Sequence, residues 1–454
     1  MSLNTVEFCS TLKIVRDKFA DLMRVAGLGV DRSRLAIAVS GGPDSTALFL
    51  LLHEWAQARN ISVTVLTVDH GLRPGSAEEA SQVANFCSRF GVDHRILPWV
   101  GPKPDTRVQA SARDVRYGLM ERWCSDNDVT ELYLGHTLDD QAETFLLRMA
   151  QGSGVDGLAA MPLVRLHGEV RIIRPLLRIS RKLILATLKE KNISFTCDPS
   201  NHDRRYARVV MRNYIEQLNE HGITTAAIAG VTRMFGRIRE QKEIMIAELF
   251  RQMVSLYPEG YAELDIVGWR QADPMVGSQL IAELLRIIGG GDYLPRRERL
   301  NRLVEVLRTQ NKGTRTLSGC VISIRGLTVR FWREFQRINE VIPIVPGTSV
   351  LWDGRFELHF NLQRPPIGSN MYVRPLGKHG WGRLLESIDS PEKIGRLKKI
   401  PGPVRYTLPA VWRGKDFIEV PDLSCSPADT LENIIQNARF KNKAPLQIVP
   451  FWVA

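Results

Sequence analysis

The first 150 residues alternate between short apolar runs and amphipathic stretches, and this alternation constrains the fold more than any other feature. Four apolar runs predict strands: LAIAVS (35–40), SVTVLTVD (62–69), HRILPW (94–99) and ELYLG (131–135). Helical spacing fills the intervals, over residues 44–59, 76–90, 108–126 and 138–150. Strands that alternate with helices form a parallel sheet covered on both faces. We therefore predict an α/β domain whose ligands bind beyond the carboxyl ends of its strands.

The rest of the chain follows a looser pattern. Residues 170–219 predict one further strand and two helices, residues 222–310 are mainly helical, and the alternation in 316–332 predicts strands. A Pro/Gly-rich segment, 341–349, is the best candidate for a linker. We expect three domains: a parallel-sheet α/β domain over 1–217, a mainly helical domain over 218–340 and a small α+β domain over 347–454.

Composition and charge narrow the class of protein. The 454 residues are 44% hydrophobic and 24% charged, which excludes collagen-like, disordered and disulfide-scaffold chains. The net charge is +12, but residues 1–170 carry 17 basic and 21 acidic side chains, whereas residues 171–212 carry 11 basic and 3 acidic. Such an excess favours a polyanionic partner, nucleic acid or an anionic membrane surface. A merely basic cytosolic protein, with an arginine-rich helix face in water, is the alternative.

Cysteine usage and hydropathy indicate the compartment. The six cysteines form no C-x-x-C pair and lack the spacings of zinc or iron–sulfur sites. We expect reduced, mostly buried thiols of a cytoplasmic protein. The N-terminus shows no apolar signal core, and no apolar run approaches the roughly 20 residues that span a bilayer.

A Gly-rich turn, Ser40-Gly41-Gly42-Pro43-Asp44-Ser45, joins the first predicted strand to the first helix. Paired glycines let the backbone approach an anion closely, and the helix start offers unpaired N–H groups. In the G-x-x-x-x-G-K-S/T loop, the lysine after the glycines reaches the β- and γ-phosphates. No lysine follows the glycines here, so the turn is better suited to bind pyrophosphate as a leaving group. Asp44 beside phosphates would require Mg²⁺. A tight turn with Asp44 capping the helix is the alternative.

A second polar cluster, Gly135-His136-Thr137-Leu138-Asp139-Asp140-Gln141-Ala142-Glu143, follows the fourth strand. Asp140 and Glu143 are three residues apart, so they share one helix face. Carboxylates at a helix start can hold Mg²⁺ or bind an amine, and His136 can donate to phosphate or transfer a proton. The alternative is a set of acids that favour the positive helix end beside a satisfied histidine.

The segment Gly152-Ser153-Gly154-Val155-Asp156-Gly157 matches G-x-G-x-x-G, the fingerprint of dinucleotide binding. That fingerprint follows a strand and opens a helix, whereas here the helix-like ETFLLRMA precedes it. We predict instead a helix end capped by glycine, and we expect no nicotinamide or flavin cofactor.

The turn at 40–45 resembles the signature of the PP-loop ATP pyrophosphatase superfamily. Together with the cluster at 135–144, it is similar to the tRNA(Ile)-lysidine synthetase family. Further matches are VDHGLR (68–73), ARDVRY (112–117), QGSGVDGLAAM (151–161), RPLL (174–177), and Asp198-Pro199-Ser200-Asn201 with Ala207, Arg208 and Arg212. Gln151 stands where the family has arginine. The resemblance is strong over 1–215 and looser in the C-terminal region.

This resemblance implies an ATP-dependent ligase that forms a carbon–nitrogen bond. Family members adenylate the C2 oxygen of the wobble cytidine in CAU-anticodon isoleucine tRNA. The ε-amine of free L-lysine then attacks C2 and expels AMP. The implied cofactors are ATP and Mg²⁺ and the implied location is the cytoplasm, while a monomer and a homodimer are both open.

The resemblance also implies residue roles. ATP would be bound by Ser40, Gly41, Gly42, Pro43, Asp44, Ser45, Asp69 and His70. The catalytic residues would be Asp44, Arg113, His136, Asp140, Glu143 and Arg208, with Mg²⁺ on Asp44 and Asp140. The tRNA would be bound by Arg174, Arg178, Arg204, Arg205, Arg212, Arg374, Lys398 and Lys399. Which carboxylate binds lysine and which binds Mg²⁺ is left open.

Three other functions compete with this one. A PP-loop tRNA thiolase would need a nucleophilic cysteine, for which Cys197 is the candidate, although it has no cysteine partner. An ammonia-dependent adenylating synthetase would leave the basic C-terminal half unexplained. A tRNA-binding protein with a dead nucleotide site conflicts with the intact turn at 40–45.

Overall fold

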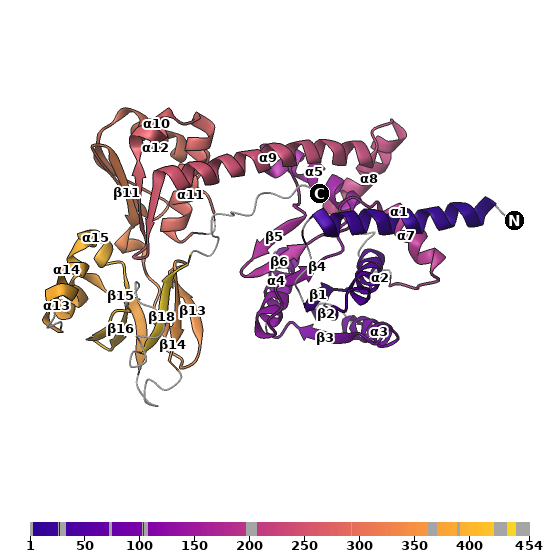
Figure 1. The fold of residues 1–454 in the computed structure, drawn as a ribbon, viewed down its shortest axis with the longest axis horizontal. Coiled ribbons are helices and arrows are strands. Elements are labelled where there is room, and N and C mark those ends of the chain that lie inside the picture. Colours follow the sequence, from indigo (N-terminus) through magenta and orange to yellow (C-terminus); the bar gives the residue numbers. More distant parts are fainter. Residues whose placement is uncertain are drawn as a thin grey trace. The chain divides into compact units, whose positions relative to one another are not determined.

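The computed structural model divides into two compact units, the first reaching Gln241 and the second beginning at Lys242 (Figure 1). It describes residues 3–25, 27, 33–71, 75–101, 103, 108–196, 207–291, 293–361, 370–387, 391–421 and 434–441.

A six-stranded sheet forms the centre of the first unit, in the order β3-β2-β1-β4-β6-β5. Its strands are β1 (Arg34–Ala38), β2 (Ser62–Asp69), β3 (Asp93–Pro98), β4 (Glu131–Tyr133), β5 (Val164–His167) and β6 (Val170–Ile173). The pairs β1–β2, β2–β3, β1–β4 and β4–β6 are parallel, and β5 pairs antiparallel with β6. Since β1 has β2 on one side and β4 on the other, the segments that follow these three strands leave the same edge of the sheet.

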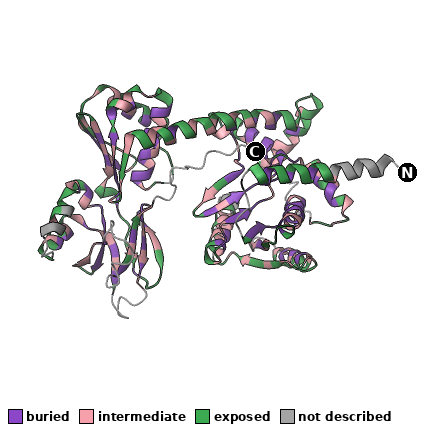
Figure 2. Cartoon of the chain, in the orientation of Figure 1, coloured by how far each residue is buried: buried purple, intermediate pink, exposed green. Residues whose placement is uncertain are grey.

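Helices cover both faces of this sheet, and the strand period of two decides which side chains they meet. In β1, Leu35 and Ile37 point to one face of the sheet. They pack into a cluster with the helices α1 (Leu3–Val25), α2 (Pro43–Gln57), α3 (Ser76–Ser88) and α7 (Arg181–Glu190). The alternate Ala36 and Ala38 pack with α4 (Val108–Asp126) on the other face. Figure 2 shows the resulting buried strands between helices with exposed outer faces.

One further helix, α5 (Leu138–Ala150), carries residues of the second predicted cluster, Leu138 to Glu143. It packs against α8 (Ala207–Glu220) through Ala142, Phe145 and Ile215, and the short α6 (Val155–Leu158) follows α5. The G-x-G-x-x-G segment begins just after α5 and runs into α6; its first glycine ends α5, because Gly152 takes a left-handed φ of 69° and donates to the carbonyl of Met149. The predicted glycine cap is therefore confirmed.

Antiparallel sheets organise the second unit. One has the order β7-β8-β11-β10-β9 and packs against α11. Its elements are α9 (Thr225–Met253), which begins in the first unit, β7 (Val254–Tyr257), β8 (Tyr261–Asp265), α10 (Ile266–Gln271), α11 (Pro274–Gly289), α12 (Arg297–Thr309), β9 (Lys312–Leu317), β10 (Cys320–Arg325), β11 (Thr328–Arg333) and η2 (Phe335–Arg337).

The C-terminal part of this unit has two smaller sheets, β12-β15-β16-β17 and β13-β14-β18. Their elements are β12 (Ile342–Pro343), β13 (Ser349–Trp352), β14 (Phe356–Phe360), β15 (Met371–Pro375), α13 (Gly377–Ser387), α14 (Pro391–Lys399), α15 (Gly402–Arg405), β16 (Pro409–Arg413), β17 (Asp416–Glu419) and β18 (Ile435–Phe440). Trp352, Phe356 and Val411 are buried in their common core.

The predicted fold class is confirmed: a parallel-sheet first domain, a helical middle and an α+β C-terminal region. The hairpin β7–β8 lies in a stretch predicted as mainly helical, and residues 341–349 contain β12 rather than only a linker. The three-domain boundaries stay a prediction. Cys87, Cys124 and Cys320 are buried free thiols, as expected, and burial raises the pKa of each to about 12. Within the described parts of the chain, no helix is long and apolar enough to cross a membrane.

Candidate active site

The Gly-rich turn forms a tight cradle between β1 and α2. Ser45 Oγ accepts a hydrogen bond from the backbone N–H of Ser40 at 3.2 Å and donates to the carbonyl of Gly42 at 3.0 Å. Gly41 has a φ of 84°, and a Cβ there would lie 3.2 Å from Val83, so a side chain would be strained. Gly42 then caps α2, whose first N–H groups stay free for an anion.

The loop after β4 lies directly against this cradle. A Cβ on Gly135 would lie 2.9 Å from the carbonyl oxygen of Asp44 and 3.0 Å from the Cα of Ser45. Only glycine permits two backbones to approach this closely. The pairing of β4 with β1 thus brings together two motifs that are about 90 residues apart in sequence.

A cavity of about 470 Å³ lies over the two loops. It is lined by residues of both motifs, Ser40, Gly42, Pro43, Asp44, Ser45, Gly135, His136 and Asp140, and by the basic side chains Arg116, Arg181, Arg208 and Arg212. The combination of helix N–H groups, carboxylates and arginines can bind a phosphorylated substrate together with a cation.

Asp44 is held in an electrostatically unfavourable position. Burial raises the pKa of its carboxyl from the ordinary 3.8 to about 6, and Asp140 adds to the rise although Arg181 opposes it. Oδ2 lies 3.6 Å from Nη2 of Arg181, while Oδ1 is buried without a hydrogen-bond partner. A buried carboxylate oxygen without a donor is costly, so Oδ1 is a candidate ligand for a bound cation.

Asp140 combines a structural and an electrostatic role. Its Oδ2 accepts from the N–H of Thr137 at 2.8 Å and from its hydroxyl at 3.0 Å, which completes a capping box at the start of α5. Its Oδ1 lies 4.0 Å from Nη1 of Arg208. One oxygen is therefore fixed by the helix cap, and the other is available at the cavity.

Known proteins identify the class to which this arrangement belongs. The model of a PP-loop domain matches residues 12–219. The chain is 35% identical to a tRNA(Ile)-lysidine synthase from Ruegeria pomeroyi, covering 86% of this chain and 88% of that protein. It is 30% identical to a tRNA(Ile)-lysidine synthase from Wolbachia pipientis wMel, covering 89% and 92%.

The chain belongs to the tRNA(Ile)-lysidine synthase family. The resemblance predicted from its motifs is confirmed, and its PP-loop domain makes it an ATP-using enzyme. Among solved structures, the U34-tRNA thiolase NcsA from Methanococcus maripaludis aligns with 50% of this chain and 78% of its own, at a TM-score of 0.44 and 19% identity. That likeness is too low to carry an argument.

Glu143 is one of the residues that we predicted to be catalytic from the sequence. In the structure it forms an ion pair with Arg212. Its side chain is only 2% exposed, and Oε1 accepts from Nε of Arg212 at 2.9 Å. Burial, followed by the charge of Asp140, raises the pKa of Glu143, whereas Arg212 lowers it. Glu143 is not among the residues that line the cavity, but it pairs with Arg212, which is, and its Oε2 is buried without a hydrogen-bond partner. Its catalytic role stays a prediction.

His136 lies at the cavity as a neutral imidazole. Burial, followed by the positive charges of Arg174 and Arg113, holds its pKa well below 6.5. Nδ1 is buried without a partner, and no ring nitrogen carries charge at neutral pH. The side chain can therefore exchange a hydrogen bond with a substrate, but it contributes no positive charge toward phosphate.

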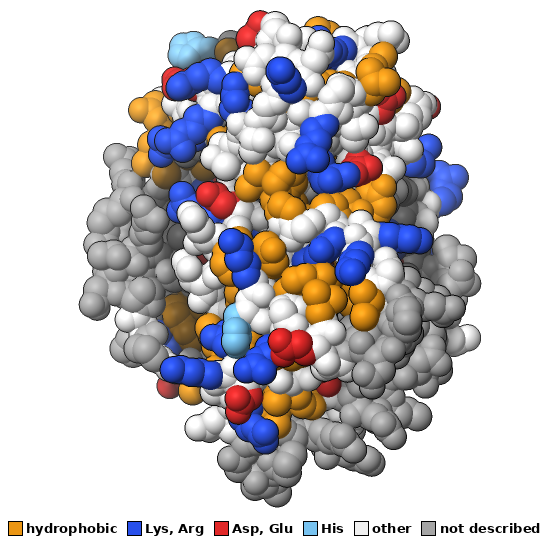
Figure 3. All heavy atoms as spheres, turned by 90° about the vertical axis from the view of Figure 1, so that its left-hand side faces the viewer, with side chains coloured by type: hydrophobic (Ala, Val, Ile, Leu, Met, Phe, Trp, Pro, Cys, Tyr) orange, Lys and Arg blue, Asp and Glu red, His pale blue; other side chains and the backbone are white. Residues whose placement is uncertain are grey.

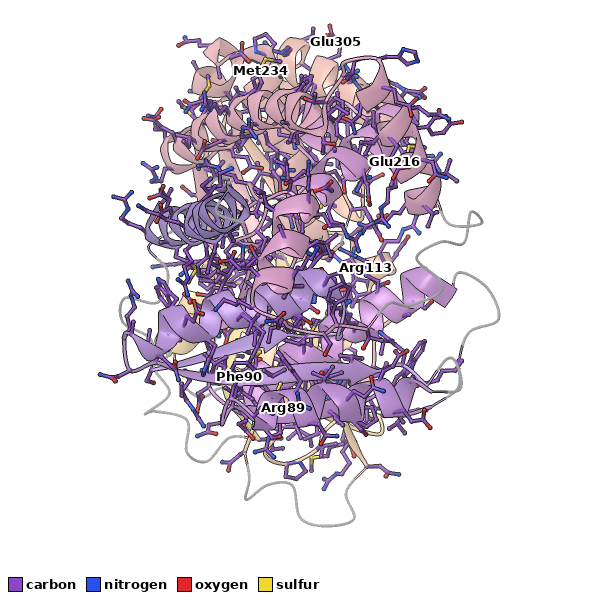
Figure 4. All side chains as sticks on the ribbon, turned by 90° about the vertical axis from the view of Figure 1, so that its right-hand side faces the viewer. Arg89, Phe90, Arg113, Glu216, Met234 and Glu305 are labelled. Atoms are coloured by element: carbon purple, nitrogen blue, oxygen red, sulfur yellow. The ribbon has the colours of Figure 1, made fainter. Side chains whose placement is uncertain are left out.

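The motif at 112–117 contains two arginines, and the catalytic role predicted for Arg113 stays a prediction. Arg113 is exposed and labelled in Figure 4, and its Nη2 lies 3.2 Å from the hydroxyl of Tyr117. Arg116 instead lines the cavity, and none of the described carboxylates lies within ion-pair distance of it. The sequence did not predict that Arg116 of α4 and Arg181 of α7 line the cavity. Helical spacing alone does not show which arginine of a helix faces the edge of the sheet.

Asp69 is the last residue of β2, the strand that pairs with β1, and His70 follows it. Neither residue lines this cavity. Asp69 Oδ1 accepts from the N–H of Gly71 and the hydroxyl of Ser76, and the second of these bonds is the main reason that its pKa is lowered. His70 packs edge-on against Trp99, with Nδ1 buried and unpartnered. Their ATP-binding role stays a prediction.

The basic side chains predicted to bind tRNA are placed differently from one another. Arg174 is buried and donates to the carbonyl of Pro162, whereas Arg178 is exposed. Arg374 lies 3.9 Å from the ring centre of Trp412. Lys398 and Lys399 are exposed at the end of α14, and Arg204 and Arg205 lie outside the described residues, as does Cys197. Contact of these residues with tRNA stays a prediction.

Proposed function

We propose that this protein ligates free L-lysine to C2 of the wobble cytidine in isoleucine tRNA with a CAU anticodon. ATP first adenylates the C2 oxygen and releases pyrophosphate, and the lysine ε-amine then displaces AMP. The observation that carries the proposal is the convergence of the cradle at 40–45 with the acidic α5 start in one cavity, in a chain of this family.

The cradle would hold the phosphates of ATP. The N–H groups at the start of α2 and the hydroxyl of Ser40 are donors that need no side-chain charge, while the Ser45 hydroxyl donates to the carbonyl of Gly42 and shapes the turn. Arg116, Arg181 and Arg208 line the same cavity and would stabilise the negative charge that develops as pyrophosphate leaves.

Asp44 and Asp140 fit a Mg²⁺ site. Asp44 Oδ1 is buried and unpartnered, the charge of Asp140 adds to the rise in the pKa of Asp44, and oxygen donors are what Mg²⁺ prefers. Bound there, the ion would supply positive charge between the carboxylates and the phosphates. The described residues contain no cluster of three or more His, Cys, Asp or Glu side chains suited to a metal, which agrees with a site completed by substrate phosphates.

Lysine would bind through its positive charge near Asp140. The ε-ammonium must lose a proton before it attacks, because free amines of this kind are mostly protonated at neutral pH. Neutral His136 is a proton acceptor at the cavity. The one free oxygen of Asp140 serves either Mg²⁺ or the lysine, and Glu143 pairs with Arg212 through Oε1 while its Oε2 has no hydrogen-bond partner.

The tRNA and the location are also part of the proposal. Residues 242–448 carry 30 basic and 22 acidic side chains, so the second unit suits a polyanion. A tRNA substrate implies the cytoplasm. Both a monomer and a homodimer are compatible with the catalytic cavity, whose lining residues all lie between Ala38 and Arg212.

The direct test is incubation with CAU-anticodon isoleucine tRNA, ATP and labelled lysine. We expect label in the tRNA together with release of AMP and pyrophosphate. Incorporation of sulfur from cysteine, or of ammonia, would replace this function by one of the competing PP-loop activities. Absence of any ATP-dependent incorporation would refute the enzyme assignment.

A further inference from the structure

The second unit contains a cavity of about 580 Å³ that the reaction above does not use. Its walls come from β10, β11, η2 and the segments that begin α13 and end α15. Three aromatic side chains line it: Trp332, Phe335 and Tyr406. Phe335 exposes 43% of its surface, so an aromatic face is open to solvent. The volume is in the range of small-ligand sites.

Polar groups at the rim are few and mostly positive or neutral. Lys378 is exposed, and no described carboxylate pairs with it. Gln336 adds an exposed amide. Arg333 is fixed by Asp353, with Nη2 to Oδ1 at 2.8 Å, so it forms a rigid wall. Glu334 is the acid of the lining, and its Oε2 lies 3.7 Å from Nε of Arg337.

This combination matches the chemistry of a nucleotide with an unstacked base. Bases in single-stranded RNA stack on aromatic side chains, and a nearby cation binds the adjacent phosphate. An amide can exchange hydrogen bonds with a base edge. Figure 3 shows the side of the molecule where α12, α13 and β11 lie. Lys and Arg side chains outnumber Asp and Glu side chains there, and apolar side chains lie between them. A purely apolar peptide would not require the unpaired Lys378.

We propose that the cavity formed by Trp332, Phe335, Tyr406 and Lys378 binds one unstacked nucleotide of the RNA substrate. The proposal rests on the proposed tRNA substrate and extends it. The base stacks against the aromatic side chains and its phosphate meets the Lys378 ammonium. Every residue of this cavity lies in the second unit, whereas every residue that lines the catalytic cavity lies in the first.

The test compares tRNA affinity of Phe335→Ala with that of Phe335→Tyr and Leu327→Ala at one salt concentration. Leu327 is 70% exposed at the β10–β11 turn of the same sheet but does not line the cavity, so it is a matched control. We expect Phe335→Ala to bind CAU tRNA about tenfold more weakly, from the energy of one base stack. Phe335→Tyr keeps the ring and should bind like the wild type, as should Leu327→Ala.

Ultraviolet cross-linking of the wild-type complex supplies a second measurement. We expect a cross-link between one of the three aromatic residues and an unpaired nucleotide. Unchanged affinity of Phe335→Ala, or a cross-link to a base-paired stem, would overturn the proposal. Wild-type transfer of lysine to tRNA is measured in parallel: if it occurs while Phe335→Ala binds normally, the pocket fails and the proposed function stands.

Discussion

Asp44→Asn should stabilise the free protein while abolishing its chemistry. The pKa of Asp44 is raised from 3.8 to about 6, so carrying its charge in the folded state costs about 3 kcal/mol at 1.36 kcal/mol per pKa unit. Its side chain is 22% exposed, so solvent screening makes this an upper value. Asparagine has nearly the same shape without the charge and removes the cost.

The sign of the pH dependence follows from the raised pKa. Stability contributed by a protonated Asp44 is present below pH 3.8 and is lost as pH rises through about 6. Asp44→Asn should therefore equal the wild type near pH 4 and exceed it by up to about 3 kcal/mol above pH 7. Urea unfolding from pH 4 to 8 measures this difference in the free energy of unfolding. Hydrogen exchange of the backbone amides of α2 reports the same difference locally.

Asp69→Asn is the matched control, because its pKa is lowered by the hydrogen bond from Ser76. Its folded-state charge is favourable above the unfolded pKa, so this substitution should destabilise the protein at pH 7 and lose its effect in acid. A wild type and an Asp44→Asn variant of equal stability at pH 7.5 would refute the account of a charge held for a cation. Pyrophosphate release that survives Asp44→Asn would refute its role in the reaction.

Three further substitutions test the site. Gly135→Ala should lower pyrophosphate release at least tenfold, because the added Cβ would lie 2.9 Å from the carbonyl oxygen of Asp44. The control Gly118→Ala adds a Cβ in open space on α4 and should leave the release unchanged. Arg212→Met should cost about 2–3 kcal/mol of stability by leaving Glu143 buried and unpaired, which urea unfolding would detect; a loss below about 0.5 kcal/mol would contradict the pairing. Arg116→Met should raise the KM for ATP without loss of stability, since none of the described carboxylates pairs with Arg116. An unchanged KM would remove Arg116 from the phosphate site.

The sequence predicted what local patterning determines. Strand β2 spans residues 62–69 as expected, and α5 begins at Leu138, because alternation and a capping box are encoded locally. The meeting of the two loops was also predictable in outline, since polar segments that follow parallel strands share one sheet edge. The close approach at Gly135 required the observed strand order.

The contacts that the sequence did not reveal depend on how helices dock. Arg113 and Arg116 are three apart on α4, and only packing against the sheet shows that Arg116 reaches the cavity. Arg212 was assigned to tRNA, yet it also binds Glu143, because α8 packs on α5 through apolar contacts that sequence spacing does not reveal. The hairpin β7–β8 was missed although its own pairing is local, and the long-range pairing of β8 with β11 holds it in the sheet.

The central claim is that lysine becomes bonded to the wobble cytidine of CAU tRNA, and nucleoside analysis tests it most directly. Wild-type protein, ATP, isotopically labelled lysine and the tRNA are incubated, and the nucleoside at the wobble position is weighed after digestion. The account predicts a nucleoside heavier than cytidine by one lysine less one water, which carries the label and is absent with Asp44→Asn. Unmodified cytidine from the wild-type reaction, or a product that contains sulfur, would contradict it.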